Sequence, residues 1–316
     1  MSQASSDDAA PNAPKRLLAT AILLVGAVMI GHPAFALLLG IGLNLTLEPV
    51  LPSGLKNAGK LLLQGAIVIL GLTLSAATLW SVSQDYAGIV VLYVFVALGL
   101  GLFLGRMIGT DLDQSRLLAA GTAICGGTAI ATLAPVIKAR ADSVAVCLAI
   151  VFLLNAIAIL TLPEIGHYLA LTQTQFGVWV ALAVHDTSSV IGTAALYGEE
   201  ALEIATTVKL ARTLWLIPLV LVAGVLLHRQ EAKLRVPGFV LLFVAASLLG
   251  SLIELDPEWV VQLKRLSKAM LVAALFMIGM EVTRSTLRTL NARAVWLGVG
   301  LWVMVLPATL LLVLAW

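Results

Sequence analysis

Apolar residues fill most of this chain in long runs that are separated by short polar or charged loops. Because the hydrocarbon core of a bilayer is about 30 Å thick, runs of this kind predict membrane-spanning helices. The first two runs are short, and we expect them to tilt or to join at Gly31-His32-Pro33. The pattern predicts an all-α polytopic membrane protein. The runs lie at 17–30, 33–46, 61–79, 86–105, 117–136, 143–162, 176–197, 204–228, 236–253, 269–283 and 294–315.

Two of the runs contain small and polar residues that a lipid-facing helix does not need. Residues 121–135 read GTAICGGTAIATLAP, with a Gly-Gly pair, three threonines and a terminal proline, and residues 183–192 read AVHDTSSVIG. A helix that breaks inside a membrane frees backbone N–H and C=O groups, which are tolerated where they line a cavity or meet a ligand. The pattern therefore predicts two broken or re-entrant helical segments around a transport site.

Composition supports the same class. The 316 residues are 60% hydrophobic and 11% charged, with a mean hydropathy of +1.05, whereas soluble domains average roughly 25% charged residues. A net charge of +2 gives no indication of nucleic-acid binding, and the two cysteines lie in apolar segments, which argues against a disulfide framework. Residues 1–14 are polar and predict a disordered cytoplasmic tail, and no cleavage site for a signal peptide is evident. We expect residues 15–316 to form a single transmembrane transporter domain.

The loop charges predict how the chain crosses the membrane, because lysine and arginine gather on the cytoplasmic side. If every run crossed once, the cluster at Lys138/Arg140 would fall outside. If 117–136 and 176–197 are re-entrant hairpins, the first from the cytoplasm and the second from the outside, every basic cluster falls inside. We favour the hairpins, with nine full spans and a cytoplasmic N-terminus, and discontinuous crossing helices are the alternative. The basic clusters are Lys15/Arg16, Lys56/Lys60, Arg106/Arg116, Lys138/Arg140, Arg229/Lys233/Arg235 and Arg284/Arg288/Arg293.

An internal repeat predicts two related halves. The favoured topology gives its two copies opposite directions, so we expect approximate inverted repeats at 33–162 and 174–316, an arrangement common in secondary transporters. The motif Lys56-x3-Lys60-x2-Leu63-x2-Ala66-x4-Gly71-x6-Thr78-Leu79 recurs 208 residues later as Lys264-x3-Lys268-x2-Leu271-x2-Ala274-x4-Gly279-x6-Thr286-Leu287.

Three strings also carry a family resemblance. They are Ile124-Cys-Gly-Gly-Thr-Ala-Ile-Ala-x-x-Ala-Pro135, Ala183-x-His-Asp-Thr-x-x-Val190 and Val208-Lys-Leu-x-Arg212. The chain resembles the YeiH-type family of proposed sulfate exporters, the UPF0324 group, over nearly its whole length after residue 15. The resemblance implies a multi-pass protein of the bacterial inner membrane, with a fold grouped with cation/proton antiporters and bile-acid symporters. Ser188-Ser189 departs from the Ala-Gln pair that such relatives often carry.

The candidate substrate-binding residues come from the two interruptions and the segments around them. At Gly126-Gly127 the freed amides of the following half-helix suit an oxyanion, and close helix packing is the alternative. Asp186 is costly in a membrane unless it is paired, protonated or in a cavity. It either caps the helix that follows or carries a proton together with His185, and both roles can hold. The candidates are Cys125, Gly126, Gly127, Thr128, Asn155, His185, Asp186, Thr187, Ser188, Lys209 and Arg212.

Four of these candidates have an alternative, purely structural interpretation. Lys209 and Arg212 are three residues apart on one helix face. Arg212 is predicted to hold an anion or to neutralise the nearby carboxylate, whereas Lys209 either joins it or extends to the surface. Asn155 either lines the site or hydrogen-bonds between helices. Cys125 is predicted to be a small apolar filler and not a nucleophile.

Three functions compete at this point. The first is secondary active transport of a small anion, sulfate or sulfonate-like, driven by a proton, sodium or substrate gradient, since no nucleotide-binding motif is present. The second is a cation/proton antiporter in which Asp186 binds the ion. The third, an intramembrane enzyme using His185, Asp186 and Ser188, is disfavoured because successive side chains on a helix point apart. We therefore expect no catalysis and no cofactor; the expected partners are the anion, H⁺ or Na⁺, lipid and, by analogy, a second copy in a homodimer.

Overall fold

The computed structural model describes residues 13–47, 58–226, 238–253, 255–281 and 290–316, and within these ranges it contains helices and no strand. The all-α prediction is confirmed. The predicted tail at 1–14 lies outside the described residues except for its last two, which begin the first helix. The helices are α1 (Ala13–Ile30), α2 (Pro33–Leu47), α3 (Ala58–Leu72), α4 (Ala76–Asp85), α5 (Ala87–Ile108), α6 (Leu112–Ala123), α7 (Gly127–Ile137), α8 (Ala141–Tyr168), α9 (Gln173–Ala183), α10 (Thr187–Tyr197), α11 (Glu199–Thr213), α12 (Leu216–Leu226), α13 (Gly238–Leu252), α14 (Pro257–Gly279) and α16 (Ala292–Ala315).

Several apolar runs become one helix each, the runs at 117–136 and 176–197 are each divided between two helices as expected, and one further run is divided by a sharp bend that was not predicted. Helices α1 and α2 join at Gly31, whose φ of +68° suits glycine, as the sequence predicted. The run at 61–79 is not a single helix, because the chain bends by 105° between α3 and α4. Among the described residues, four helices are long and apolar enough to span a membrane, or five if this bent pair counts as one span. The predicted count of nine full spans is not reached by that criterion.

Two serines of α13 stabilise the bend between α3 and α4. A sharp bend leaves backbone groups without their helical partners, and these groups need others when they are buried. Ser247 Oγ donates to the Leu74 carbonyl at 2.8 Å, and the Ala76 N–H donates to Ser251 Oγ at 2.7 Å. The position of the bend therefore depends on contacts from a helix more than 170 residues away in the chain.

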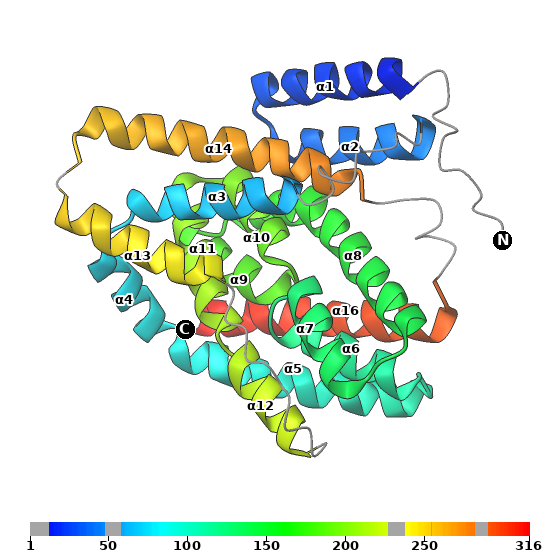
Figure 1. The fold of residues 1–316 in the computed structure, drawn as a ribbon. Coiled ribbons are helices and arrows are strands. Elements are labelled where there is room, and N and C mark those ends of the chain that lie inside the picture. Colours follow the sequence, from blue (N-terminus) through cyan, green and yellow to red (C-terminus); the bar gives the residue numbers. More distant parts are fainter. Residues whose placement is uncertain (1–12, 48–57, 227–237, 254, 282–289) are drawn as a thin grey trace.

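The helices form two layers that can be followed in Figure 1. Helices α1, α2, α3, α13 and α14 lie together in the upper part of the view, and we call them the scaffold layer. Helices α5 to α12 and α16 share a separate, larger apolar core below, which we call the hairpin layer. A smaller apolar cluster joins the layers, since Ile191 and Leu210 of the hairpin layer pack with Leu271 and Leu275 of α14.

The two copies of the sequence repeat pack side by side in the scaffold layer. Gly59 of α3 lies against Met277 of α14, and Ser267 Oγ of α14 donates to the Ala66 carbonyl of α3 at 2.8 Å. Since residue numbers rise along one helix as they fall along the other, α3 and α14 run antiparallel. This agrees with the opposite directions expected of the two copies, while the inverted repeats 33–162 and 174–316 as a whole stay a prediction.

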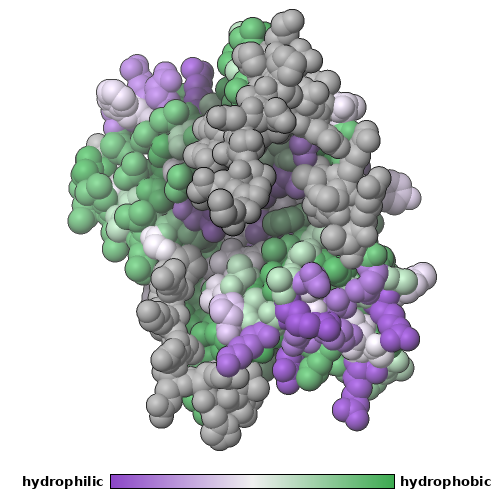
Figure 2. Space-filling view, turned by 45° about the vertical axis from the view of Figure 1, so that its right-hand side comes forward, coloured by the Kyte–Doolittle hydropathy of each residue, from purple (hydrophilic) through white to green (hydrophobic). Residues whose placement is uncertain are grey.

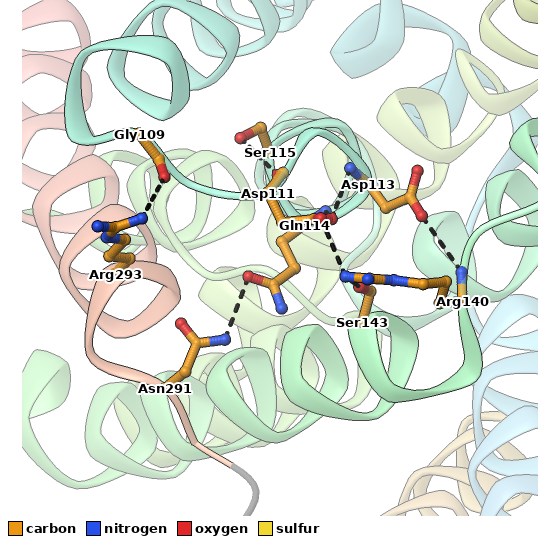
Figure 3. Close-up of polar contacts among 9 residues, drawn as sticks. All are labelled: Gly109, Asp111, Asp113, Gln114, Ser115, Arg140, Ser143, Asn291 and Arg293. Atoms are coloured by element: carbon orange, nitrogen blue, oxygen red, sulfur yellow. Dashed lines mark hydrogen bonds and ion pairs between the residues drawn. The ribbon is translucent and has the colours of Figure 1, made fainter.

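The first interrupted segment, α6 and α7, is a re-entrant hairpin. Arg140, which follows α7, forms an ion pair of 2.9 Å with Asp111, which precedes α6, and its backbone N–H donates to Asp113 Oδ2 at 3.2 Å (Figure 3). The segment therefore returns to the side from which it entered. Arg293 and Asn291 at the start of α16 bond to Gly109 and Gln114 at the same end of the molecule (Figure 3).

The second interrupted segment, α9 and α10, is also a re-entrant hairpin. Gln173 Oε1 at the start of α9 accepts hydrogen bonds from the N–H groups of Glu200 (3.1 Å) and Ala201 (3.3 Å), which follow α10. Tyr197, at the end of α10, donates from its hydroxyl to the Leu171 carbonyl at 2.6 Å. The start and the end of this segment therefore lie together as well.

Helix α8 shows that the two hairpins enter from opposite sides. It begins beside the base of the first hairpin and ends at Tyr168, next to the base of the second. Its 28 residues give a length of about 42 Å at 1.5 Å per residue. Each interrupted segment therefore turns back on itself, as the favoured prediction expects of a hairpin, and the membrane side from which each one enters stays a prediction.

Candidate functional site

The tips of the two hairpins touch at the centre of the hairpin layer. Gly126 has φ +58° and ψ −123°, a conformation that side chains rarely allow. A Cβ atom built there would lie 3.0 Å from the Asp186 nitrogen and 3.0 Å from the His185 carbonyl carbon. Two features therefore require glycine at 126: its backbone conformation and the close approach of the His185–Asp186 backbone. Gly127 has no such conformation and packs at ordinary distance against Leu148.

The carbonyl end of α9 is fully occupied by side-chain donors. The last carbonyls of a helix carry partial negative charge and have no partner inside it. Here three side chains from α11 and α16 supply every bond to five consecutive carbonyls. Arg212 Nη1 donates to Ala181 (2.8 Å) and Leu182 (2.6 Å), Trp302 Nε1 to Ala183 (3.1 Å), and Lys209 Nζ to Val184 (2.8 Å) and His185 (2.5 Å).

Arg212 also caps the carbonyl end of α6, so one guanidinium joins both hairpins. Its Nε donates to the Ile124 carbonyl, and its Nη2 donates to the Thr122 carbonyl at 3.2 Å. Tyr93 of α5 donates its hydroxyl to the same Thr122 carbonyl at 2.9 Å and places its ring 4.8 Å from the guanidinium carbon. Arg212 and Lys209 are both 0% exposed, so the interpretation of Lys209 as a residue that extends to the surface is wrong.

The amide ends of α7 and α10 differ from these carbonyl ends. Asp186 is the N-cap of α10, where its carboxylate accepts the Ser188 N–H at 3.1 Å and the Ser188 hydroxyl. The capping role predicted for Asp186 is confirmed. Helix α7 has Gly126 as N-cap and therefore no side-chain cap. Cys125, which precedes this end, is buried.

Asn155 and His185 connect α8 to the second tip. Asn155 Oδ1 accepts the His185 backbone N–H at 3.2 Å, and His185 Nε2 lies 3.1 Å from Thr122 Oγ1 of the first hairpin. Both side chains are 2% exposed. Within the described residues, Asn155 Nδ2 and His185 Nδ1 are the buried side-chain atoms that have no hydrogen-bond partner. A buried amide donor without a partner is costly, which marks this place as one that suits a ligand or a water molecule.

Thr128 and Asp186 are the candidate residues that stay partly exposed, whereas the other candidates are buried. Asp186 caps α10, a helix that packs against α2 and α14 of the scaffold layer. Figure 2 shows the molecule from the end where α6, α8 and α16 begin. Hydrophilic residues gather at this end, and other hydrophilic residues lie in a hollow between the upper and lower parts of the view.

The structure thus brings every predicted site residue to one place, with Gly127 and Thr187 as the first residues of α7 and α10. Sequence reasoning missed three participants: Tyr93, Thr122 and Trp302. A signal for two of them was present, because tyrosine and tryptophan in membrane proteins favour the interfaces. Tyr93 and Trp302 instead stand inside apolar runs, where a buried hydroxyl or indole N–H needs a partner.

Replacing Trp302 by phenylalanine is expected to destabilise the protein by about 1–3 kcal/mol, because the Ala183 carbonyl loses its donor in a buried place. The measurement is thermal unfolding of purified protein in detergent. Trp296, on the same helix, is 69% exposed, and Trp296→Phe is the matched control. Equal melting temperatures for the two variants would contradict the capping role of Trp302.

Comparison with known proteins gives consistent matches over most of the chain. The family model described as Conserved hypothetical protein 698 matches residues 16–298. The UPF0324 membrane protein Bd1437 of Bdellovibrio bacteriovorus is 41% identical over 284 residues, which are 88% of this chain and 87% of that protein. The UPF0324 membrane protein GSU2818 of Geobacter sulfurreducens is 40% identical, with 88% and 89% covered. A UPF0324 membrane protein of Porphyromonas gingivalis is also 40% identical, with 89% and 87% covered. No solved structure matches the chain.

Proposed function

We propose that this chain, which belongs to the UPF0324 family of membrane proteins, is a secondary transporter that moves a small anion of the sulfate or sulfonate class. Its relatives are named membrane proteins from bacteria, and several of its helices are long and apolar enough to span a bilayer. Two re-entrant hairpins whose tips meet between the two sides offer a place that can be reached from one side and then the other. We place the N-terminus in the cytoplasm, on the basis of the basic clusters.

The observation that carries the proposal is that the carbonyl ends of the helices at the tips have side-chain hydrogen-bond partners, whereas the amide end of α7 has none. The two carbonyl ends, which would attract a cation, are occupied by Arg212, Lys209 and Trp302. The amide end of α7 has no side-chain cap, and the Asn155 amide nearby has a free donor. Amide ends favour anions, and the two buried positive charges add to that field. Arg212 and Lys209 would then favour an anion through their charge and not by direct contact.

Asp186 explains how such a site could be coupled to protons. An ionised carboxylate at the tip repels an anion, whereas a protonated one can donate a hydrogen bond to it. Asp186 is partly exposed, whereas His185 is 2% exposed and bonded on one nitrogen to Thr122. Of the two groups suggested by the sequence, we therefore assign proton uptake to Asp186.

The test is uptake of labelled sulfate and of a short alkanesulfonate into liposomes that contain the purified protein. Uptake should increase as the external pH falls, because protonation of Asp186 removes its repulsion of the anion. In Asp186→Asn this dependence on pH should disappear. Glu164→Gln is the matched control. Glu164 is exposed near the C-terminal end of α8, and this variant should keep the pH dependence of uptake. Folded protein that takes up neither anion at any pH would refute the proposal.

One observation favours a second candidate, a cation/proton antiporter. Asp186 is a partly exposed carboxylate at the tip, and carboxylate oxygens are ligands that a cation prefers. In that case a sodium gradient should drive proton movement in liposomes without any permeant anion. Asp186→Asn should abolish this flux, whereas it should remove only the pH dependence of labelled-anion uptake if the first candidate holds.

A further inference from the structure

A cavity lies away from the hairpin tips, between the scaffold layer and the hairpin layer. Its volume is about 260 Å³, and it is lined by residues of α3, α10, α11 and α14. None of the predicted site residues lines it. One part of the lining is charged, from Glu199, Glu203, Lys264 and Lys268, and the other part is apolar.

The cavity follows one face of α10 from the base of the second hairpin toward its tip. Gly198, Ala195 and Ile191 line it, and they are spaced by three and four residues, as one helix face requires. The next position on this face is Thr187, the first residue of α10, which lies one turn or about 6 Å further along the axis. The inner end of the cavity is therefore about one helical turn from the candidate site.

An apolar layer separates the cavity from the tip. Leu275 of α14 is 0% exposed, and a Cβ atom at Gly192 of α10 would lie 2.8 Å from its Cδ1. Ile191 is 3% exposed and belongs to the same apolar cluster. Ile191 and Leu275 are thus buried aliphatic side chains of one cluster where α10 and α14 approach closely, and such packing leaves little room for water or ions between the cavity and Thr187.

Charged residues at the other end of the cavity connect the two layers. Lys264 of α14 forms ion pairs with Glu199 (3.3 Å) and Glu203 (3.0 Å) of α11. Glu199 is largely exposed, so this end lies toward the surface beside the second hairpin. Lys268 takes part in none of the ion pairs found in the described part of the chain, and together with Lys264 it balances the two carboxylates, so the charged lining carries no net negative charge that would repel an anion.

We infer that this cavity is the entrance by which an anion reaches the hairpin tips from the second-hairpin side, closed in this conformation by Ile191 and Leu275. The inference rests on the proposed function for the identity of the solute. Asp186 and Thr128 at the tips are partly exposed and do not line the cavity, so the cavity and the tips are separate places that this route would connect. The ion pairs of Lys264 hold the two layers together while the entrance is closed, and they must separate for the layers to move apart.

Cysteine labelling from each side of membrane vesicles tests this route without requiring transport. The native Cys125 and Cys147 are both buried and can stay in place. Ala195→Cys should react with a membrane-impermeant, negatively charged methanethiosulfonate added from the second-hairpin side and not from the other. Two exposed reference positions report the sides, Glu164→Cys for the second hairpin and Lys138→Cys for the first. The lipid-facing control is Leu92→Cys on α5, which should be unreactive from both sides.

A second labelling experiment tests the closed layer. Ser188→Cys should be unreactive from the second-hairpin side and should become reactive there when Leu275→Ala is added. Ile191→Ala replaces Leu275→Ala if that variant is not monodisperse in size-exclusion chromatography. Ser188→Cys that stays unreactive in both backgrounds, or Ala195→Cys that reacts only from the first-hairpin side, overturns the inference.

The charge of Lys268 gives a further check on the solute class. Lys268→Glu should lower the rate at which the anionic reagent labels Ala195→Cys several-fold. It should raise the rate of labelling by a cationic reagent of similar size. Equal effects on both reagents contradict a role for this charge in attracting anions. Labelling is independent of uptake, so a correct labelling pattern without anion uptake would refute the proposed function and leave the route intact.

Discussion

Gly126→Ala is expected to abolish transport and to lower the stability of the protein by several kcal/mol. The backbone at Gly126 has φ +58° and ψ −123°, which costs about 1–3 kcal/mol for a residue with a side chain. The new methyl group would also lie 3.0 Å from the backbone of His185 and of Asp186. Overpacking in a filled interior costs about 1–3 kcal/mol more. Because the tips touch at this point, the variant must separate them or distort one of them.

Thermal unfolding in detergent and uptake in liposomes measure the two expected losses. Gly300→Ala in α16 is the matched control, because a Cβ atom there meets nothing within 4 Å and alanine favours a helix. It should melt at or slightly above the temperature of the unchanged protein. If Gly126→Ala melted together with this control, the contact between the tips would be wrong, and the candidate site would be wrong with it.

The hairpins were predictable because small and polar residues interrupt apolar runs that would otherwise form membrane-spanning helices. The Gly-Gly pair at 126–127 and the His-Asp pair at 185–186 have no use in a lipid-facing helix, and Lys138/Arg140 fits the positive-inside rule only if the first segment turns back. Both signals are local or depend on simple counting. The structure shows that both segments turn back, with the Asp111–Arg140 ion pair as the direct observation for the first hairpin, while the membrane side of the basic cluster stays a prediction.

Other features could not be predicted because they depend on distant contacts. The bend between α3 and α4 needs Ser247 and Ser251, which no local pattern connects to it, so the run at 61–79 read as one helix. The role of Arg212 also depends on geometry. A sequence shows that an arginine is present in an apolar helix, but only the arrangement of both hairpins shows that four carbonyls surround it.

Arg212→Ala is expected to prevent stable folding, with or without an anion. Arg212 donates to the carbonyls of Thr122, Ile124, Ala181 and Leu182, which belong to both hairpins. Each buried carbonyl left without a donor costs about 1–3 kcal/mol. Tyr93 still donates to the Thr122 carbonyl, so three carbonyls lose their side-chain donor, and the summed cost approaches the total stability of an ordinary protein, about 5–15 kcal/mol. Arg212→Lys should recover part of this loss, because an ammonium keeps the charge but has only three donors from a single atom.

The same series separates a capping arginine from one that binds the anion directly. If Arg212 only bound the anion, Arg212→Ala would melt like the unchanged protein in anion-free buffer and would lose uptake alone. We instead expect melting temperatures, measured without anion, to fall most in Arg212→Ala, less in Lys209→Ala, which frees two carbonyls, and least in Arg106→Ala on the exposed end of α5. This order follows from the number of carbonyls left without a donor. Any other order would contradict the role of Arg212 and Lys209 as caps of the helix carbonyl ends.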